Sequence, residues 1–406
     1  QRDHGKPLPG GVPELQKMVG RQLGTLLGSP FRWQRHGESG LWVSELFPHV
    51  AKYVDDLCVV RSMHTEGFDH ANAALMMNTG AINFSRPSLG SWITYGLGSE
   101  NSDLPGFLTI CPGRSRGPRN HSNAFLPAAY QGTALGHDGM PTREATINHL
   151  ANRHLAGPMQ QKQLEFIQEL NRDHRTRSAG EDRLDGIIQS FELAFRMQHE
   201  VPRLMDLSTE SPHTLAAYGI GDEETDDFGR QCLFARRCAE LGVRFIQLNH
   251  SIRRRYPDIP DWDQHRDLEE GLRLNCTAVD QPIAALLGDL KERGMLDETL
   301  VLWGGEFGRT SVLERRGDDP RLWGRDHNPL GFTMWLAGGG VKGGFAYGAT
   351  DPFGYRAVEN KVHIHDVHET ILHMLGIDNE KLTYRHAGRD FRLTDVYGRV
   401  VDEILA

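Results

Sequence analysis

Three clusters of acidic and basic residues lie beside segments whose pattern predicts buried β-strands. In chain order they are His250, Asp261, Asp263 and His265 after residues 243–248, Glu306 and Arg309 after 299–303, and Asp326 and His327 before 332–337. Loops at the carboxyl edge of a parallel sheet gather ligands, so we expect these clusters to meet. Carboxylates and imidazoles together are what a divalent metal such as zinc or manganese requires. Any single pair is weak evidence in a chain with 20 histidines, but the three clusters together predict one metal site.

Arg309 lies three residues after Glu306 and has two candidate roles. Its guanidinium matches the oxygens of a sulfate or phosphate bidentately, so it could clamp an anionic substrate. Alternatively it forms an ion pair with Glu306 itself. The sequence leaves both interpretations open.

A denser histidine run precedes the last predicted helix. It reads His363-Ile364-His365-Asp366-Val367-His368. Alternate histidines on a short strand would share one face and could bind a metal. The same residues could instead cap the helix, and this choice also stays open.

The elements that must position these residues alternate between helix and strand. Strands are predicted at 57–60, 243–248, 298–303 and 332–337, and helices near 13–27, 44–56, 71–77, 184–197, up to Gly242, 277–293 and 368–375. Such alternation is typical of an α/β/α sandwich with a mostly parallel central sheet. We expect one domain over 1–406, in which the charged segment 141–227 is a helical insertion or cap.

Composition excludes several classes of protein. The chain has 406 residues, enough for a sizeable core, and a net charge of -9, which argues against binding a nucleic-acid backbone. A membrane-spanning helix needs a stretch of about 18 apolar residues, and the sequence contains no such stretch. The five cysteines form neither a disulfide framework nor a thiolate metal site, so we expect packed thiols. Short basic runs at 114–119 and 253–255 are solvated loops or contacts to an anionic substrate.

Several motifs resemble those of the planctomycete-type bacterial family called domain of unknown function 1501, in the alkaline phosphatase and sulfatase superfamily. The match covers nearly the whole chain. Its carriers are Arg61-Ser62-Met63-His64, Asp69-His70, Asn78-Thr79-Gly80, Arg86 to Trp92, Glu192 to Gln198, Trp262 to His265, Gly304 to Thr310 and Gly324 to Pro329. The resemblance implies an alkaline phosphatase-like fold.

The resemblance also implies roles for individual residues. Asp263, His265 and His327 match the order of ligands at the first metal of the superfamily. Glu306 stands where an acidic ligand of the second metal is usual. The superfamily nucleophile is replaced by His70, which could bind metal or transfer a proton, with Arg309 neutralising developing charge. A water activated by zinc, manganese or calcium would then be the attacking group.

Other implications concern what precedes Gln1 and what the chain acts on. Family members usually carry an export signal and an N-terminal strand with a metal-binding Asp, so we expect a periplasmic or extracellular protein and a domain that here lacks that strand. The resemblance implies a metal-dependent hydrolase of sulfate or phosphate esters, on a small molecule or a polysaccharide. The alternatives are a non-catalytic protein that binds anionic polysaccharide, or a metal-dependent phosphodiesterase or phosphomutase. The sequence does not indicate the oligomeric state.

Overall fold

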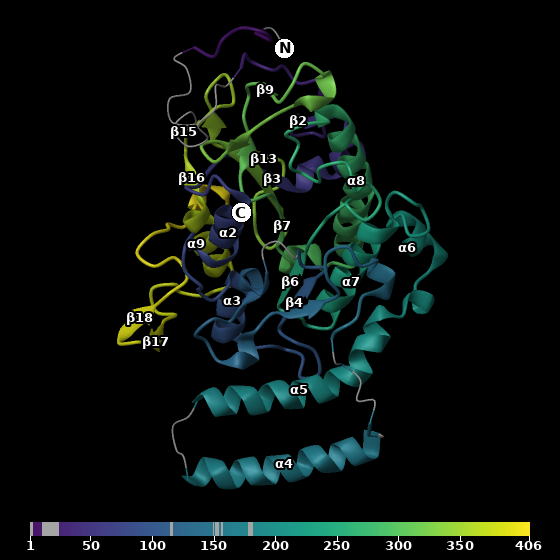
Figure 1. Ribbon diagram of the computed structural model, residues 1–406, viewed down its shortest axis with the longest axis vertical. Coiled ribbons are helices and arrows are strands. Elements are labelled where there is room, and N and C mark those ends of the chain that lie inside the picture. The colour runs from purple at the N-terminus through teal and green to yellow at the C-terminus, as the bar shows by residue number, and fades with distance from the viewer. Residues whose placement is uncertain are drawn as a thin grey trace.

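The computed structural model describes residues 3–9, 24–113, 117–148, 150, 154–155, 157–177 and 182–406 (Figure 1). Most of the helix predicted at 13–27 lies outside these residues. Its last four residues are described and are not helical, because Leu26 forms an antiparallel bridge to Val312 instead.

The larger sheet has five strands and is mixed. β3 (Leu57–His64) runs parallel to β13 (Phe345–Tyr347) and β16 (Val362–His363), whereas β12 (Phe332–Ala337) is antiparallel both to β3 and to β7 (Val301–Trp303). The expectation of a mostly parallel central sheet is therefore not confirmed. Periodicity reports which face a residue occupies and does not report strand direction, so it predicts the bounds of β12. The expectation of a mostly parallel sheet rests on the alternation of helices and strands, which does not fix the direction of each strand.

A second sheet is wholly parallel. It contains β5 (Thr133–Leu135), β4 (Phe107–Ile110) and β6 (Phe245–Leu248) in that order. Among the described strands, β6 and β7 each pair along one edge only. The segments that follow β6 and β7 carry Asp263, His265, Glu306 and Arg309.

Helices cover both faces of the sheets. Their bounds are α2 (His70–Thr79), α3 (Leu89–Leu97), α4 (Gly157–Arg177), α5 (Asp182–Met205), α6 (Pro212–Ala217), α7 (Asp226–Glu240), α8 (Leu268–Glu292) and α9 (Ile364–Met374). One apolar core lies under α7 and α8, and another lies between the large sheet and α2, α3 and α9. Figure 1 shows these two sets of helices on opposite sides of the strands. The expected α/β architecture is confirmed.

The remaining elements are short. The strands are β1 (Trp33–His36), β2 (Leu41–Ser44), β8 (Gly308–Arg309), β9 (Glu314–Arg315), β10 (Trp323–Gly324), β11 (His327–Asn328), β14 (Ala349–Thr350), β15 (Ala357–Glu359), β17 (Tyr384–His386) and β18 (Arg389–Phe391). The 3-10 helices are η1 (Val50–Asp56), η3 (Pro118–His121), η4 (Ala128–Tyr130), η5 (Thr142–Glu144), η6 (Leu207–Thr209), η7 (Leu296–Glu298), η8 (Pro320–Leu322) and η9 (Asp402–Ile404). The predicted helix leading into the first strand corresponds to η1 followed by β3.

The segment 141–227 contains only helical elements among its described residues, namely η5, α4, α5, η6, α6 and the start of α7. In Figure 1, α4 and α5 lie next to each other at one end of the molecule. Its role as a cap stays a prediction. None of the described helices is long and apolar enough to cross a membrane. The five cysteines are buried free thiols, as expected.

Candidate metal centre

The candidate site is assembled by segments that are far apart in the chain. His70 is the first residue of α2, whose N-cap Asp69 accepts a hydrogen bond from Asn72 N. Asp263 and His265 lie in the loop between β6 and α8. His327 begins β11 and is paired across the ladder with Arg309 of β8. A cap, a loop and a short antiparallel ladder thus fix the positions of these side chains.

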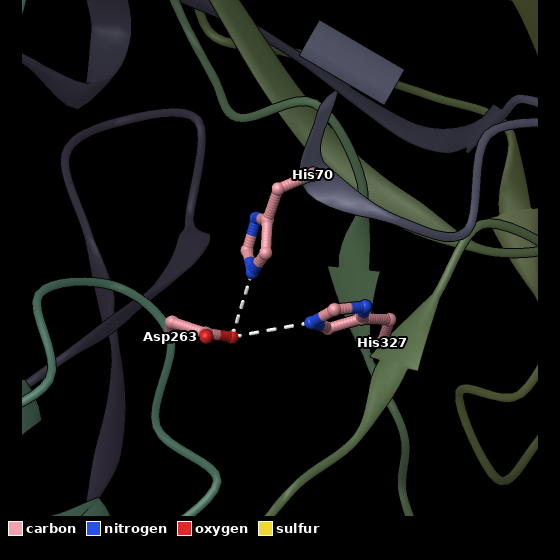
Figure 2. Close-up of side chains that lie close together, drawn as sticks. All are labelled: His70, Asp263 and His327. Atoms are coloured by element: carbon pink, nitrogen blue, oxygen red, sulfur yellow. Dashed lines mark hydrogen bonds and ion pairs between the residues drawn. The ribbon is translucent and has the colours of Figure 1, made fainter. Parts of the chain in front are cut away.

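Three imidazoles converge on one carboxylate oxygen. Asp263 Oδ1 lies 2.8 Å from His70 Nε2 and 3.1 Å from His327 Nε2 (Figure 2). His265 Nε2 lies 3.1 Å from the same oxygen. Arg309 Nη2 reaches it as well, at 2.6 Å. All these side chains are partly or largely buried.

The opposite nitrogen of each imidazole has its own partner. His327 Nδ1 lies 2.6 Å from the carbonyl oxygen of Phe68, and His70 Nδ1 lies 2.6 Å from Glu306 Oε1. His265 Nδ1 contacts Glu314, a buried carboxylate. Because carbonyl and carboxylate oxygens accept, each Nδ1 carries the proton when the ring is neutral, and each Nε2 lone pair then points to the centre. Metal-ligating histidines are usually oriented in this way.

Without a cation the centre is poorly satisfied. His265 Nε2 and His327 Nε2 are 3.1 Å apart, and neutral rings oriented as above would place two lone pairs against each other. His70 Nε2 is buried and makes no hydrogen bond with correct geometry to any described residue, despite its closeness to Asp263. Buried polar atoms normally have partners. A cation among these atoms would satisfy them, so the donor set fits a metal ion.

A second carboxylate extends the donor set. Asp326 is 1% exposed, and its Oδ2 has no hydrogen-bond partner among the described residues. Two overlapping groups have ligand atoms close enough to share an ion: His70 with Asp263 and His327, and His265 with Asp326 and His327. The second group includes Asp326, which belongs to one of the three predicted clusters but was not predicted to be a metal ligand.

The pKa values reflect the same crowding. Burial raises the pKa of Asp263, but its contacts with His265, His327, His70 and Arg309 lower it by more, so the net shift is downward. Burial lowers the pKa of His70 and of His265, yet their carboxylate partners raise both above the ordinary value. Positive charge, as protons or as a metal ion, is therefore favoured at these nitrogens.

Only some of the residues predicted for the metal site lie at its centre. Asp263, His265, His327 and His70 meet at the centre, whereas Glu306 lies behind His70 on its Nδ1 side. Arg309 forms its ion pair with Asp263. His250 and Asp261, which belonged to the first cluster, have other partners. His250 Nδ1 accepts from Trp262 Nε1 at 2.9 Å, and Asp261 accepts from Ser251 Oγ and Ile252 N.

The histidine run near α9 is a capping arrangement. His363 accepts from His365 N, and Asp366 completes a capping box by accepting from His363 N. His365 and His368 contact the carbonyl oxygens of Gly80 and Met77. Of the two interpretations that the sequence left open, the structure shows the capping one: β16 ends at His363 and His365 belongs to α9, so these histidines do not alternate on one strand. The capping box gives the segment helical geometry.

The basic run at 253–255 has an ordinary structural role. Arg253, Arg254 and Arg255 each approach an acidic side chain, with Asp261, Asp227 and Glu223 at 2.8, 3.7 and 3.0 Å. Arg114 and Arg116 lie outside the described residues.

Sequence reasoning missed two residues that support the centre. Glu314, on the two-residue strand β9, contacts His265 and has no periodic signal to reveal it. Gly324 lies against the backbone of Gln264 and His265, which a Cβ at that position would overlap. The glycine that opens the segment Gly324 to Pro329 therefore gives the His265 loop room to reach the centre.

The fold and centre define an α/β protein in which three histidines and two aspartates place donor atoms close enough together that they could hold a cation. The chain belongs to the family described as "Protein of unknown function (DUF1501)", whose model matches residues 1–405. This confirms the family resemblance drawn from the motifs. No curated protein matches the sequence.

Solved structures show a distant similarity. A sulfatase, PsFucS1 from Pseudoalteromonas sp., is 13% identical with a TM-score of 0.38, over 82% of this chain and 63% of that one. The lipoteichoic acid synthase LtaP from Listeria monocytogenes is 10% identical with a TM-score of 0.39, over 82% and 66%. The phosphonate monoester hydrolase SpPMH from Silicibacter pomeroyi is 13% identical with a TM-score of 0.32, over 88% and 71%. The chain thus spans less than two thirds of PsFucS1, and these scores carry no functional conclusion.

Proposed function

We propose that this protein is a metal-dependent hydrolase of sulfate or phosphate esters. The observation that carries the proposal is the convergence of His70, His265 and His327 through Nε2, with each Nδ1 held from behind by an oxygen. A structural hydrogen-bond cluster would not need three inward lone pairs beside two aspartates. His70, Asp263, His265, Asp326 and His327 would hold one or two divalent ions such as zinc, manganese or calcium.

A bound divalent ion would supply Lewis acidity and lower the pKa of water toward neutrality. The protein's own contribution is orientation and charge. Arg309 presents a partly exposed guanidinium beside the centre, where it would bind an anionic ester oxygen and neutralise charge that develops there. Its contact with Asp263 holds that guanidinium in place.

His70 is better suited to bind the ion than to attack the substrate. Its Nδ1 is engaged by Glu306, and its Nε2 points at the other donors. With its Nε2 bound to the ion, this imidazole would have no free nitrogen for nucleophilic attack, and water would be the nucleophile. Glu306 would then orient His70, and would not be a ligand of a second ion.

The same observation favours one competing function. A protein that binds anionic polysaccharide through a metal and Arg309, without catalysis, would need the same ligands and no nucleophile. Location outside the cytoplasm stays an expectation from the family resemblance in both cases.

The test combines metal analysis with turnover. The purified chain is analysed for bound metal and assayed on a panel of aryl sulfates, phosphates and phosphonates, with and without a chelator. His265→Ala removes one donor, and His373→Ala is the matched control because His373 is exposed on α9. Turnover that is lost with chelator and His265→Ala, and kept in His373→Ala, supports the hydrolase. Bound metal without turnover on any ester supports the binding protein, and the absence of metal under all loading conditions rejects both.

A further inference from the structure

An exposed aromatic pair lies on the hairpin formed by β1 and β2. Trp33 is 52% exposed and Trp42 is 59% exposed. The register pairs Trp33 with Ser44 and Arg35 with Trp42. Because residues two apart on a strand and residues directly opposite share a face, both tryptophans and Arg35 lie on the same face of the hairpin.

The two rings are held in place before any ligand binds. Trp33 Nε1 donates to Ser29 Oγ at 3.3 Å, and the Arg35 guanidinium lies 5.3 Å from the centroid of the Trp42 ring. The hairpin turn is fixed by Asp55, whose carboxylate accepts from the backbone N–H groups of Glu38 and Ser39 at 2.9 Å. Rings that are already oriented lose little entropy when they bind a ligand.

The chemistry of this face matches a sugar ring. A pyranose has an apolar C–H face and a rim of hydroxyl groups, so it can cover an indole while its edge stays in water. Arg35 forms no ion pair with a carboxylate among the described residues, which leaves its charge available to an anion. An anionic membrane surface is recognised by clustered Lys and Arg. This face presents one guanidinium, that of Arg35, which suits a single anionic group on a sugar unit.

We propose that Trp33, Arg35 and Trp42 form a binding site for a pyranose unit of an anionic polysaccharide, separate from the metal centre. The inference deepens the proposed function and rests on it for one point, namely that the ester substrate is a saccharide. The site would hold the polymer while an ester group on another unit reaches the centre.

The hairpin is linked to the metal centre through α8. Phe31, just before β1, packs under Arg273, whose guanidinium lies 5.0 Å from the ring centroid. Arg273 is on α8, which begins at Leu268, three residues after His265. At about 1.5 Å of rise per residue, Arg273 is roughly one and a half turns from the start of α8. The hairpin therefore lies beside the first turns of the helix that follows the His265 loop.

The binding test uses affinity electrophoresis of the full chain in native gels containing dextran sulfate or neutral dextran. The parent should be retarded more by dextran sulfate than by dextran. Trp33→Ala/Trp42→Ala should weaken the retardation about tenfold in apparent Kd, and Arg35→Gln should remove the preference for the sulfated polymer. Phe84→Ala/Tyr397→Ala is the matched control, since these residues are 69% and 61% exposed, and should behave as the parent.

Further measurements separate this inference from the proposed function. Far-UV circular dichroism confirms that each variant is folded, and turnover of a small aryl ester should be unchanged in the tryptophan variant. Retardation that is equal in the parent and the tryptophan variant overturns the inference, even where ester turnover is normal. Retardation that depends on the tryptophans in a protein without turnover leaves the inference standing and rejects the hydrolase. A tryptophan-dependent dimer in gel filtration, with no polymer binding, identifies a second copy as the occupant and also overturns it.

Discussion

Replacing Glu314 by glutamine should weaken metal binding by about 10- to 100-fold. Glu314 is 5% exposed and contacts His265 Nδ1 and Arg316 Nε. Burial raises the pKa of Glu314, but His265 and Arg316 lower it from 4.5 to about 2. At 1.36 kcal/mol per pKa unit this net shift corresponds to about 3 kcal/mol for the partners of Glu314 together. Loss of a residue that orients a metal-ligating histidine typically costs about 10- to 100-fold in metal affinity, which stays below this total.

The assay is a titration of metal-stripped protein with zinc in competition with a chromophoric chelator. Glu314→Gln should raise the Kd while stoichiometry and fold are preserved, because all ligands remain. Arg316→Gln is the matched control, since it removes another partner of Glu314 and leaves the contact between Glu314 and His265 in place. A Kd for Glu314→Gln within twofold of the parent, or a change no larger than that of Arg316→Gln, would refute the idea that Glu314 orients a metal ligand.

Three further changes have expected outcomes. Burial lowers the pKa of His368 from 6.5 to about 4, so His368 becomes protonated in the unfolded chain at a higher pH than in the folded protein. Denaturant titrations should therefore show about 2 kcal/mol less free energy of unfolding at about pH 5 than at about pH 7.5. His368→Gln should remove this pH-dependent loss. A Cβ at Gly348 (φ +67) would overlap Ser62 Oγ, whereas Gly354 (φ +68) has open space; Gly348→Ala should cost about 2 kcal/mol or more and Gly354→Ala about 1 kcal/mol in the same experiment. Asp326→Asn should lower zinc affinity in the chelator titration without unfolding the chain, and unchanged affinity would exclude Asp326 as a ligand.

The sequence could predict the parts of the structure that depend on periodicity. β12 was predicted at 332–337 and is observed at Phe332–Ala337. The expected meeting of Asp263 and His327 also follows from position, since both lie in loops next to predicted strands. Such residues are predictable because hydrophobic pattern sets the strand, and the strand sets where its loop begins.

The remaining features depend on contacts that pattern does not encode. Glu314 supports His265 from a two-residue ladder whose register is set by its partner strand. His365 reads as a strand residue by alternation, yet the capping box of His363 and Asp366 starts a helix there. The antiparallel direction of β12 is likewise decided by how the chain returns, and no local signal reports it.

Charge at the centre links metal binding to the choice of substrate. Four carboxylates surround the histidines, those of Asp263, Glu306, Glu314 and Asp326, and two guanidiniums, Arg309 and Arg316, contact them. Counted over these six side chains, and with neutral imidazoles, negative charge exceeds positive charge by two, which would repel an anionic ester. One divalent ion cancels this excess, and protonated histidines would do so only by giving up the nitrogens that face the centre. In the proposed hydrolase, binding of a sulfate or phosphate ester would therefore require the metal, and the ion and Arg309 together would supply the positive charge that the substrate meets.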